Sequence, residues 1–389
     1  MIEESVESRF IIGFTEEQKV IRDTIKDYAD HVIRPKVMEF DEAQEFPLAI
    51  LKELGEMGFM GILIPEQYGG SGLGYVEYAL IIEELAKVDP SIALSVAAHN
   101  GLCTNHLYLF GNEEQREKYL PDLASGRVIG AWGLTEPFSG SDAAAMKTTA
   151  VKESGAWMVN GSKNFITHGT YADTSVILAI TNKEKGKKGI SAFIAGRNYD
   201  GYSASKKENK LGMRASDTAQ LSFMNLRLPE ENLLGNEGEG FIQAMKVLEG
   251  GRISIAALSC GLAQGALDAS LKYSSERVQF GKSINSFQGI QFKLADMETN
   301  INAARLLTYQ AAVAKDNGQP IHDIAPKAKL FASEIAEKAA SEAVQIFGGY
   351  GFTKDYPVEK FYRDVKLLTI GEGTSEVQRI VIARNLAQE

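Results

Sequence analysis

The chain has 389 residues, 44% of them hydrophobic and 24% charged, which is an ordinary globular composition. Its length predicts two or three domains and a large buried core. The net charge of −10 argues against general binding to nucleic acid or to an anionic membrane, although local basic residues could still meet a phosphorylated ligand.

Residues 14–125 are predicted to form an N-terminal all-α domain. Thr15 and Gln18 fit a capping box that opens its first helix. The glycine-rich connection 65–72 is not a dinucleotide fingerprint, because its glycine spacing is wrong and no strand-then-helix pattern surrounds it. No Walker A sequence occurs in the chain. Apolar residues repeat at helical spacing at Ile50, Leu51, Leu54 and Met57.

Residues 126–236 are predicted to form a small middle domain of mostly antiparallel β-structure. Turn residues, such as Asn160-Gly161 and those at 186–189, separate its short β-prone runs. These runs are Ala156–Val159, Thr174–Ile180, Ile190–Ala195 and Ala219–Phe223.

Residues 237–389 return to long helices, which are predicted to pack as a C-terminal four-helix bundle. Residues 325–344 form an alanine-rich helix. The expected fold class is therefore mainly α with a central antiparallel β domain. An apolar stripe at spacings of three and four consists of Leu294, Met297, Ile301, Ala304 and Leu307.

Cys103 and Cys260 match no metal-ligand spacing, and we expect both to be buried thiols in a reducing compartment. The five histidines form no paired metal motif, so we expect no metal site. Residues 1–4 are acidic and lack the apolar core of a signal peptide. We expect no apolar run long enough to span a bilayer. The expected location is cytoplasmic, or the mitochondrial matrix if the chain is a processed eukaryotic one.

Two glycine-interrupted segments could carry chemistry. Residues 133–142 (Gly-Leu-Thr-Glu-Pro-Phe-Ser-Gly-Ser-Asp) offer hydroxyls and free backbone N–H groups, which can bond ring carbonyls and phosphate oxygens. The alternative is an ordinary polar turn. Residues 345–352 (Gln-Ile-Phe-Gly-Gly-Tyr-Gly-Phe) fit a helix that ends in a glycine C-cap, and such an end can bring backbone close to a ligand.

A third segment places a single carboxylate, Glu372, between Gly371 and Gly373. The glycines remove side-chain bulk and allow unusual backbone angles. Ser375 with Gln378 fits a capping box, so a helix should begin here, and a helix N-terminus also favours phosphate groups. Taken alone, Glu372 would be one of many loop carboxylates.

Together these segments resemble the acyl-CoA dehydrogenase family, from about residue 14 to the end of the chain. Residues 133–142 and the segment that runs from Gln345 to Asp364 satisfy the family's two signature patterns at every constrained position, and Gly-Glu-Gly-Thr-Ser-Glu follows at 371–376. The resemblance implies an enzyme of fatty-acid β-oxidation, with FAD between the β domain and the bundle and an acyl-CoA thioester beside the flavin. A carboxylate would remove the α-proton while the β-hydrogen leaves as hydride to flavin N5. The product would be a trans-2-enoyl-CoA, and electrons would pass to electron-transferring flavoprotein.

The resemblance assigns the base to Glu372, which needs a raised pKa because the α-proton is weakly acidic. Some branches of the family place the base in an earlier helix, immediately before an Arg. That position here is Gly251, before Arg252, and a glycine cannot be the base. The backbone N–H of Glu372 would help to hold the thioester oxygen. The acyl-CoA contacts implied are Ser141, Glu249, Arg252, Gly371 and Glu372.

The FAD contacts are also implied by position. Ser141 would lie near the pyrophosphates of FAD and CoA, and Thr374 to Glu376 would meet the FAD phosphates. A further set of residues would reach the FAD bound by a neighbouring subunit. An FAD site built by two subunits implies a homo-oligomer, which in the family is usually a tetramer. The flavin ring would meet Trp132, Leu134, Thr135, Phe165 (Trp in many relatives) and Thr167. The set from the neighbouring subunit is Arg277, Phe280, Gln288, Gln345, Gly348 and Gly349.

Two departures bear on the substrate. Many short- and medium-chain relatives have Tyr where this chain has Gly371, which predicts a wider pocket and tolerance of branched acyl groups. No Arg or Lys occurs between Asp89 and Asn100, which disfavours a dicarboxylic substrate because a buried carboxylate would be unpaired. The resemblance is closest to short-chain, butyryl-type members.

Other functions of the same fold remain open. An acyl-CoA oxidase is usually much longer, whereas an enoyl-CoA reductase or a bifurcating enzyme would differ mainly in its partner. A non-catalytic acyl-CoA- or flavin-binding protein would not require Glu372, Thr135 and Thr167.

Overall fold

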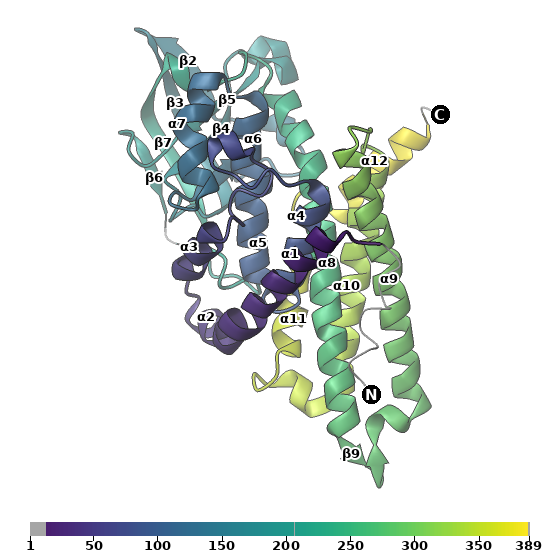
Figure 1. Ribbon diagram of the computed structural model, residues 1–389. Coiled ribbons are helices and arrows are strands. Elements are labelled where there is room, and N and C mark those ends of the chain that lie inside the picture. The colour runs from purple at the N-terminus through teal and green to yellow at the C-terminus, as the bar shows by residue number, and fades with distance from the viewer. Residues whose placement is uncertain (1–12, 206, 388–389) are drawn as a thin grey trace.

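The structure is a computed structural model that describes residues 13–205 and 207–387 (Figure 1). Helices, a β-sheet and long helices follow one another along the chain, which confirms the predicted fold class. The expectation about residues 1–4 lies outside the described residues.

The N-terminal helices begin with the predicted capping box. Thr15 Oγ1 accepts the N–H of Gln18 at 3.2 Å, and Gln18 Oε1 accepts the N–H of Thr15 at 3.0 Å. Every residue of α5 is buried. The helices are α1 (Glu16–Tyr28), α2 (Val37–Ala43), α3 (Leu48–Glu56), α4 (Tyr75–Ala86), α5 (Pro90–Ala98), α6 (Asn105–Phe110) and α7 (Glu113–Ala124). Ile50, Leu51 and Leu54 of the predicted stripe are buried, whereas Met57 follows the end of α3 and is 36% exposed.

The sheet is mixed rather than purely antiparallel. Strands β1 and β2 pair with β4 in parallel, and the other pairings are antiparallel. The strands are β1 (Gly130–Gly133), β2 (Thr149–Glu153), β3 (Ala156–Thr167), β4 (Thr174–Ile180), β5 (Ile190–Ala195), β6 (Tyr202–Ala204), β7 (Thr218–Pro229) and β8 (Leu233–Leu234). Their order is β6-β7-β3-β2-β4-β5-β8, with β1 beside β4.

One predicted turn is wrong. Asn160-Gly161 lies inside β3, where the register against β7 shifts between Val159 and Gly161. The Asn-Gly pair was mistaken for a turn because glycine is common both in turns and at β-bulges, and here it forms a β-bulge. A Cβ on Gly161 would lie 2.4 Å from Thr148 Oγ1, so the glycine permits a close approach of the neighbouring chain.

The C-terminal helices are α8 (Gly240–Glu276), α9 (Gln288–Asp316), α10 (Ile324–Phe347), α11 (Val358–Asp364) and α12 (Ser375–Leu386). Figure 1 shows α8, α9 and α10 side by side, with the hairpin of β9 (Val278–Gln279) and β10 (Lys282–Ser283) at one end and α12 toward the other. The predicted stripe of α9 faces the core, because Leu294, Met297, Ile301 and Ala304 are all buried.

We expected no apolar run long enough to span a bilayer, and by the criteria of length and composition this expectation is wrong. Helix α8 is long and apolar enough to cross a membrane. However, 83% of the apolar 18-residue stretch of this helix is buried inside the protein. The apolar length of α8 therefore belongs to the core: it packs against α4, α9 and α10.

Three apolar clusters fill the molecule. The first joins the N-terminal helices to α8, α9 and α10. The second lies between α6, α7, one face of the sheet and the start of α8, and the third covers the other face of the sheet. Cys103 and Cys260 are buried free thiols, as predicted, and burial raises the pKa of each to about 12. Helix α8 thus links the sheet to the bundle.

Candidate active site

Glu372 lies in the turn before α12 in an unusual backbone conformation. Its φ is +52° and that of Gly373 is +96°. The left-handed region is costly for a residue with a side chain, and such residues persist where the surrounding structure over-determines them. The turn therefore has a defined shape that presents the Glu372 side chain.

The start of α12 corrects one prediction. The helix begins at Ser375, but its capping residue is Thr374, whose Oγ1 accepts the N–H of Val377 at 3.3 Å. Gln378 does not complete a capping box. Its Nε2 instead donates to the carbonyls of Glu372 at 3.3 Å and Gly373 at 3.0 Å. The side chain of Gln378 is thus used to hold the turn.

The carboxylate of Glu372 lies against the glycine pair of α8. A Cβ on Gly251 would be 1.8 Å from Glu372 Oε2, so any side chain there would displace the carboxylate. Oε2 is buried and has no hydrogen-bond partner within the described residues. An unpaired buried carboxylate oxygen is costly, and it is poised to receive a proton.

Burial raises the pKa of Glu372 from its usual 4.5 to about 7. The positive charges of Lys329 and Arg252 oppose that rise. A carboxylate with a pKa near the working pH is suited to general-base catalysis, because it is partly ionised and still basic.

Two tyrosines of α4 lie near the base: Tyr75 lies against Gly250, and Tyr78 interacts electrostatically with Glu372. The Tyr78 hydroxyl donates to the Ala97 carbonyl at 2.7 Å, and Asn105 Nδ2 donates to the Tyr75 hydroxyl at 3.1 Å. A Cβ on Gly250 would lie 2.5 Å from the Tyr75 hydroxyl. The tyrosines and Gly250 therefore enclose one side of the space around the base.

Sequence reasoning missed Tyr75, Tyr78 and Lys329. The tyrosines follow each other at i and i+3 on one helix, but that spacing is also typical of ordinary core residues. Lys329 was detectable as a single cation on the buried face of an alanine-rich helix. Its relation to Glu372, however, arises only from tertiary packing.

The end of β1, the loop after it and the end of β3 bring together the residues predicted to meet a flavin ring. Trp132 Nε1–H donates to His106 Nδ1 at 2.9 Å, which fixes the indole. The Thr135 carbonyl accepts the N–H of Asn164 at 2.8 Å, so this loop lies beside the end of β3, which carries Phe165 and Thr167. Phe165 has a φ of +56° and is 64% exposed.

A buried ion pair anchors the loop that follows β1. Lys163 Nζ lies 2.7 Å from Glu136 Oε1 and 3.2 Å from the Leu134 carbonyl, and both side chains are almost fully buried. The Glu136 carboxylate also accepts the backbone N–H groups of Lys147 and Thr148, at 2.5 Å and 3.1 Å. Ser141, farther along the loop, is exposed.

Helix α8 connects this loop to the base. His106 bonds Gln243 Oε1 at 3.1 Å. Gly251 follows Gln243 by eight residues, about 12 Å along a helix axis. Arg252, next to Gly251, is 8% exposed, and its Nε has no partner among the described residues. Helix α8 therefore contacts both the base and, through His106, the segment that carries Trp132. Glu249 lies on the same helix.

A second group of predicted FAD contacts lies at the hairpin end of the bundle, away from Glu372. Arg277 is placed over the Tyr350 ring at 5.5 Å, and with Gly348 and Gly349 it lines a cavity of about 520 Å³. Phe280 is 93% exposed at the hairpin, with a φ of +53°. Gln288 opens α9, and Gln345 lies in the last turn of α10. Within one chain the structure does not bring this group to Thr374 and Glu376 at the start of α12.

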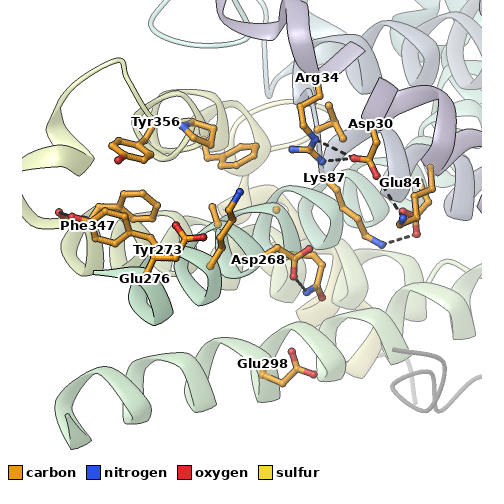
Figure 2. A pocket seen from close by; sticks show the side chains of 18 of the residues that line it. Asp30, Arg34, Glu84, Lys87, Asp268, Tyr273, Glu276, Glu298, Phe347 and Tyr356 are labelled. Atoms are coloured by element: carbon orange, nitrogen blue, oxygen red, sulfur yellow. Dashed lines mark hydrogen bonds and ion pairs between the residues drawn. The ribbon is translucent and has the colours of Figure 1, made fainter. Parts of the chain in front are cut away.

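Another cavity, of about 730 Å³, contains none of the predicted site residues (Figure 2). Its walls come from α1, α4, α8, α9 and the segment after α10. Arg34 pairs with Asp30, and Lys87 with Glu84, so these charges are already satisfied. This cavity is larger than the one at Arg277, but the left-handed turn and the unpaired carboxylate make Glu372 the stronger candidate for chemistry. Among the described residues no cluster of His, Cys, Asp and Glu could hold a metal ion.

Comparisons with known proteins agree over most of the chain. The N-terminal, middle and C-terminal domains of acyl-CoA dehydrogenases match residues 15–127, 131–226 and 238–387. A short-chain specific acyl-CoA dehydrogenase of Clostridium acetobutylicum is 47% identical over 371 residues, which are 95% of this chain and 98% of that protein. Subunit CarC of a caffeyl-CoA reductase–Etf complex of Acetobacterium woodii is 43% identical over 377 residues, 97% of this chain and 100% of that protein. The solved structure of butyryl-CoA dehydrogenase from Megasphaera elsdenii has a TM-score of 0.95 at 42% identity and covers 97% of this chain and 100% of that one.

Proposed function

The chain belongs to the acyl-CoA dehydrogenase family of FAD-dependent oxidoreductases, and on that premise we propose that Glu372 removes the α-proton of a short- to medium-chain or branched acyl-CoA. The observation that carries the proposal is the contact of the Glu372 carboxylate with the bare backbone of Gly251. That contact leaves Oε2 buried, unpaired and with a pKa of about 7.

The residues present fit FAD. Ser375 Oγ is a buried polar atom without a partner among the described residues, and it lies at the N-terminus of α12, where a phosphate is favoured. Phe165 offers an exposed ring beside Thr167 and the Trp132–Thr135 segment. When bound, FAD supplies the acceptor for the hydride that leaves the β-carbon.

We assign the holding of FAD to three groups of residues. Trp132, Leu134, Thr135, Phe165 and Thr167 would surround the ring. The phosphates would meet Ser141 and the residues from Thr374 to Glu376. A neighbouring subunit would contribute Arg277, Phe280, Gln288, Gln345, Gly348 and Gly349, which explains why these lie at the far end of the bundle in a single chain.

The chain's own residues can perform the proton transfer. Oε2 of Glu372 takes the α-proton, and the turn between Gly371 and Gly373 fixes the direction of the carboxylate. The backbone N–H of Glu372 has no acceptor within the described residues, so it is free to hold the thioester oxygen as negative charge develops. Tyr75, Tyr78 and the glycine pair exclude water from the base, which sustains its raised pKa. Glu249 and Arg252 would lie along the channel.

The net direction of the reaction is a separate question. The A. woodii relative is named as a subunit of a reductase–Etf complex, so the same site could serve enoyl-CoA reduction or electron bifurcation. That relative also supports electron-transferring flavoprotein as the redox partner. We propose the dehydrogenase direction because the C. acetobutylicum relative is named as a dehydrogenase and has higher identity. We further propose a homo-oligomer, because the assigned FAD contacts form two separate groups in one chain.

The test is anaerobic bleaching of the purified flavoprotein by acyl-CoAs from butyryl to palmitoyl, with isobutyryl- and isovaleryl-CoA. Wild type should bleach rapidly with short chains, and Glu372→Gln should retain FAD but bleach at least about a hundredfold more slowly. Reoxidation by electron-transferring flavoprotein then tests the partner. A yellow wild-type protein that none of these acyl-CoAs bleaches would contradict the proposal. Reduction of enoyl-CoA by reduced electron-transferring flavoprotein, without the forward reaction, would favour the reductase.

A further inference from the structure

A fully buried lysine serves the turn that carries the base. Lys329 lies on α10 and is 0% exposed. Its Nζ donates to the carbonyl of Gly373 at 2.7 Å. In the part of the chain that the structure describes, this ammonium forms no ion pair with a carboxylate. A buried cation is costly unless it is satisfied, so its position needs an explanation beyond packing.

The hydrogen bond from Lys329 fixes the peptide between Gly373 and Thr374, the second peptide after Glu372. Gln378 Nε2 donates to the same Gly373 carbonyl at 3.0 Å, so two side chains from two helices hold one oxygen. Gln378 Nε2 also donates to the Glu372 carbonyl at 3.3 Å, and that carbonyl belongs to the peptide that would have to rotate for Glu372 to leave the left-handed region. The two donors therefore stabilise the conformation that points the carboxylate at Gly251.

The charge of Lys329 acts on the same residue. Burial lowers the pKa of Lys329 to about 8, and the largest opposing effect comes from Glu372. Lys329 in turn is the first of the two cations that oppose the rise in the pKa of Glu372. A lysine that served only the core would be paired with a carboxylate outside the active site. Lys329 instead interacts with the Glu372 carboxylate and with the carbonyl of the turn that carries it.

We propose that Lys329 is a positioning residue for Glu372, anchoring the Gly373 carbonyl and supplying a buried positive charge beside the carboxylate. The inference deepens the proposed function of Glu372 and rests on it. The hydrogen bond of Lys329 goes to the Gly373 carbonyl of the turn, so Lys329 acts on Glu372 through the turn.

The charged and titratable groups around Glu372 limit what can replace Lys329. Helix α8 contributes Arg252 and Glu249, α4 contributes Tyr75 and Tyr78, and α12 contributes Glu376. Of these, only Arg252 is a cation. Removal of Lys329 therefore leaves the Glu372 carboxylate with one nearby positive charge, and its protonated form becomes more favourable.

Three variants separate the two effects. Lys329→Gln keeps a donor for the Gly373 carbonyl without the charge, and Lys329→Met removes both. Lys338→Met is the matched control, because Lys338 is an exposed lysine of the same helix. The measurement is kcat and KM against pH for anaerobic flavin reduction by butyryl-CoA, on holoenzyme with FAD content checked.

The expected result is a shift of the acid limb of kcat toward higher pH by roughly one unit in Lys329→Gln. Lys329→Met should show the same shift and, in addition, a plateau lower by about tenfold or more, because the turn loosens. KM should change less than threefold, and Lys338→Met should match wild type.

An acid limb that stays in place in Lys329→Gln would overturn the proposal. So would loss of folded flavoprotein in both Lys329 variants while Lys338→Met folds, since Lys329 would then be a folding residue only. Failure of the proposed function gives a different pattern, because wild type and Lys338→Met would then also fail to bleach.

Discussion

Gly251 and Glu372 are complementary: the missing side chain of the one is the space that the carboxylate of the other occupies. A Cβ on Gly251 would lie 1.8 Å from Glu372 Oε2 and 2.9 Å from its carboxyl carbon. Gly251 lies within α8 and Glu372 in the turn before α12, so the contact is a tertiary one. By the resemblance to the family, these are the two positions at which its different branches are expected to carry the base.

Gly251→Ala should therefore displace the carboxylate without removing it. A displacement of about 1 Å can cost a hundredfold in rate, so we expect flavin reduction by butyryl-CoA to slow by between about ten- and a hundredfold. FAD content and the melting temperature check that the protein still folds. A rate within twofold of wild type would show that the carboxylate can relocate and that the fit is not required.

The pH dependence of the wild-type reaction should follow Glu372. The carboxyl group is the base only when ionised, and burial raises its pKa to about 7. The rate of flavin reduction should thus rise as pH increases through about 7 and level off above it. The measurement is stopped-flow bleaching from pH 5.5 to 9 at saturating acyl-CoA. A rate that is flat across this range would contradict the assignment.

The same group should make the protein less stable at high pH. Its folded pKa of about 7 exceeds the usual 4.5, so the folded state binds the proton more tightly. The resulting stability is present below pH 4.5 and is lost as pH rises through 7. At pH 8 we expect Glu372→Gln to unfold with a free energy about 1 to 3 kcal/mol higher than wild type.

Chemical unfolding at pH 5 and pH 8 checks this linkage. The advantage of Glu372→Gln should be largest at pH 8 and should shrink at pH 5. An advantage of the same size at both values would mean that the substitution acts through packing rather than through the ionisation of Glu372.

The buried pair Lys163–Glu136 should be important for both stability and cofactor retention. Lys163→Met leaves the Glu136 carboxylate buried without its cation, which is expected to cost about 3 to 5 kcal/mol in the free energy of unfolding. The loop carrying Leu134 also loses an anchor, so FAD should dissociate more readily. Adding Glu136→Gln to Lys163→Met should recover part of the loss.

Lys152→Met supplies the matched control. Lys152 pairs with Glu230 on the surface, where both side chains are about half exposed, so the change should be within about 1 kcal/mol. Urea denaturation and the FAD content of dialysed protein are the measurements. Equal effects of Lys163→Met and Lys152→Met would contradict the role given to burial.

The sequence predicted well those features of the fold that depend on neighbouring residues, such as buried strands and helix caps. The runs at 174–180 and 190–195 coincide with β4 and β5, whose residues are almost all buried and therefore read as continuous apolar stretches. The capping box at Thr15 was predicted because its two partners are three residues apart. At the start of α12 the same kind of pattern chose the wrong residue: Ser375 with Gln378 fitted a capping box, but the cap is the adjacent Thr374.

The parts of the site that the sequence could not give are long-range. Tyr78 and Lys329 come from other helices, α4 and α10, and only packing brings them to Glu372. The flanking glycines predicted unusual backbone angles in this turn, but not that Glu372 itself is left-handed. The hydrogen bonds from Gln378 to the turn were not predicted either, because that residue also fitted a capping box. The division of the FAD contacts into two sets was implied by the resemblance, whereas the distance between the two sets within one chain follows from the length of α8 and α10.

Gly371 should influence which acyl groups enter. A Cβ there would lie 3.5 Å from the Leu367 carbonyl and 3.6 Å from Leu367 Cδ1, which are ordinary contacts, and the φ of Gly371 is not in the left-handed region. A larger side chain can therefore be attached without backbone strain. In Gly371→Tyr the phenol should fill space near the reacting carbons, so kcat/KM for isobutyryl- and isovaleryl-CoA should fall relative to butyryl-CoA by about tenfold or more. Gly371→Ala is the size control and should change that ratio by less than threefold. If Gly371→Tyr leaves the ratio of branched to straight substrates unchanged, another side chain already fills this space, and the width of the pocket is not set by Gly371.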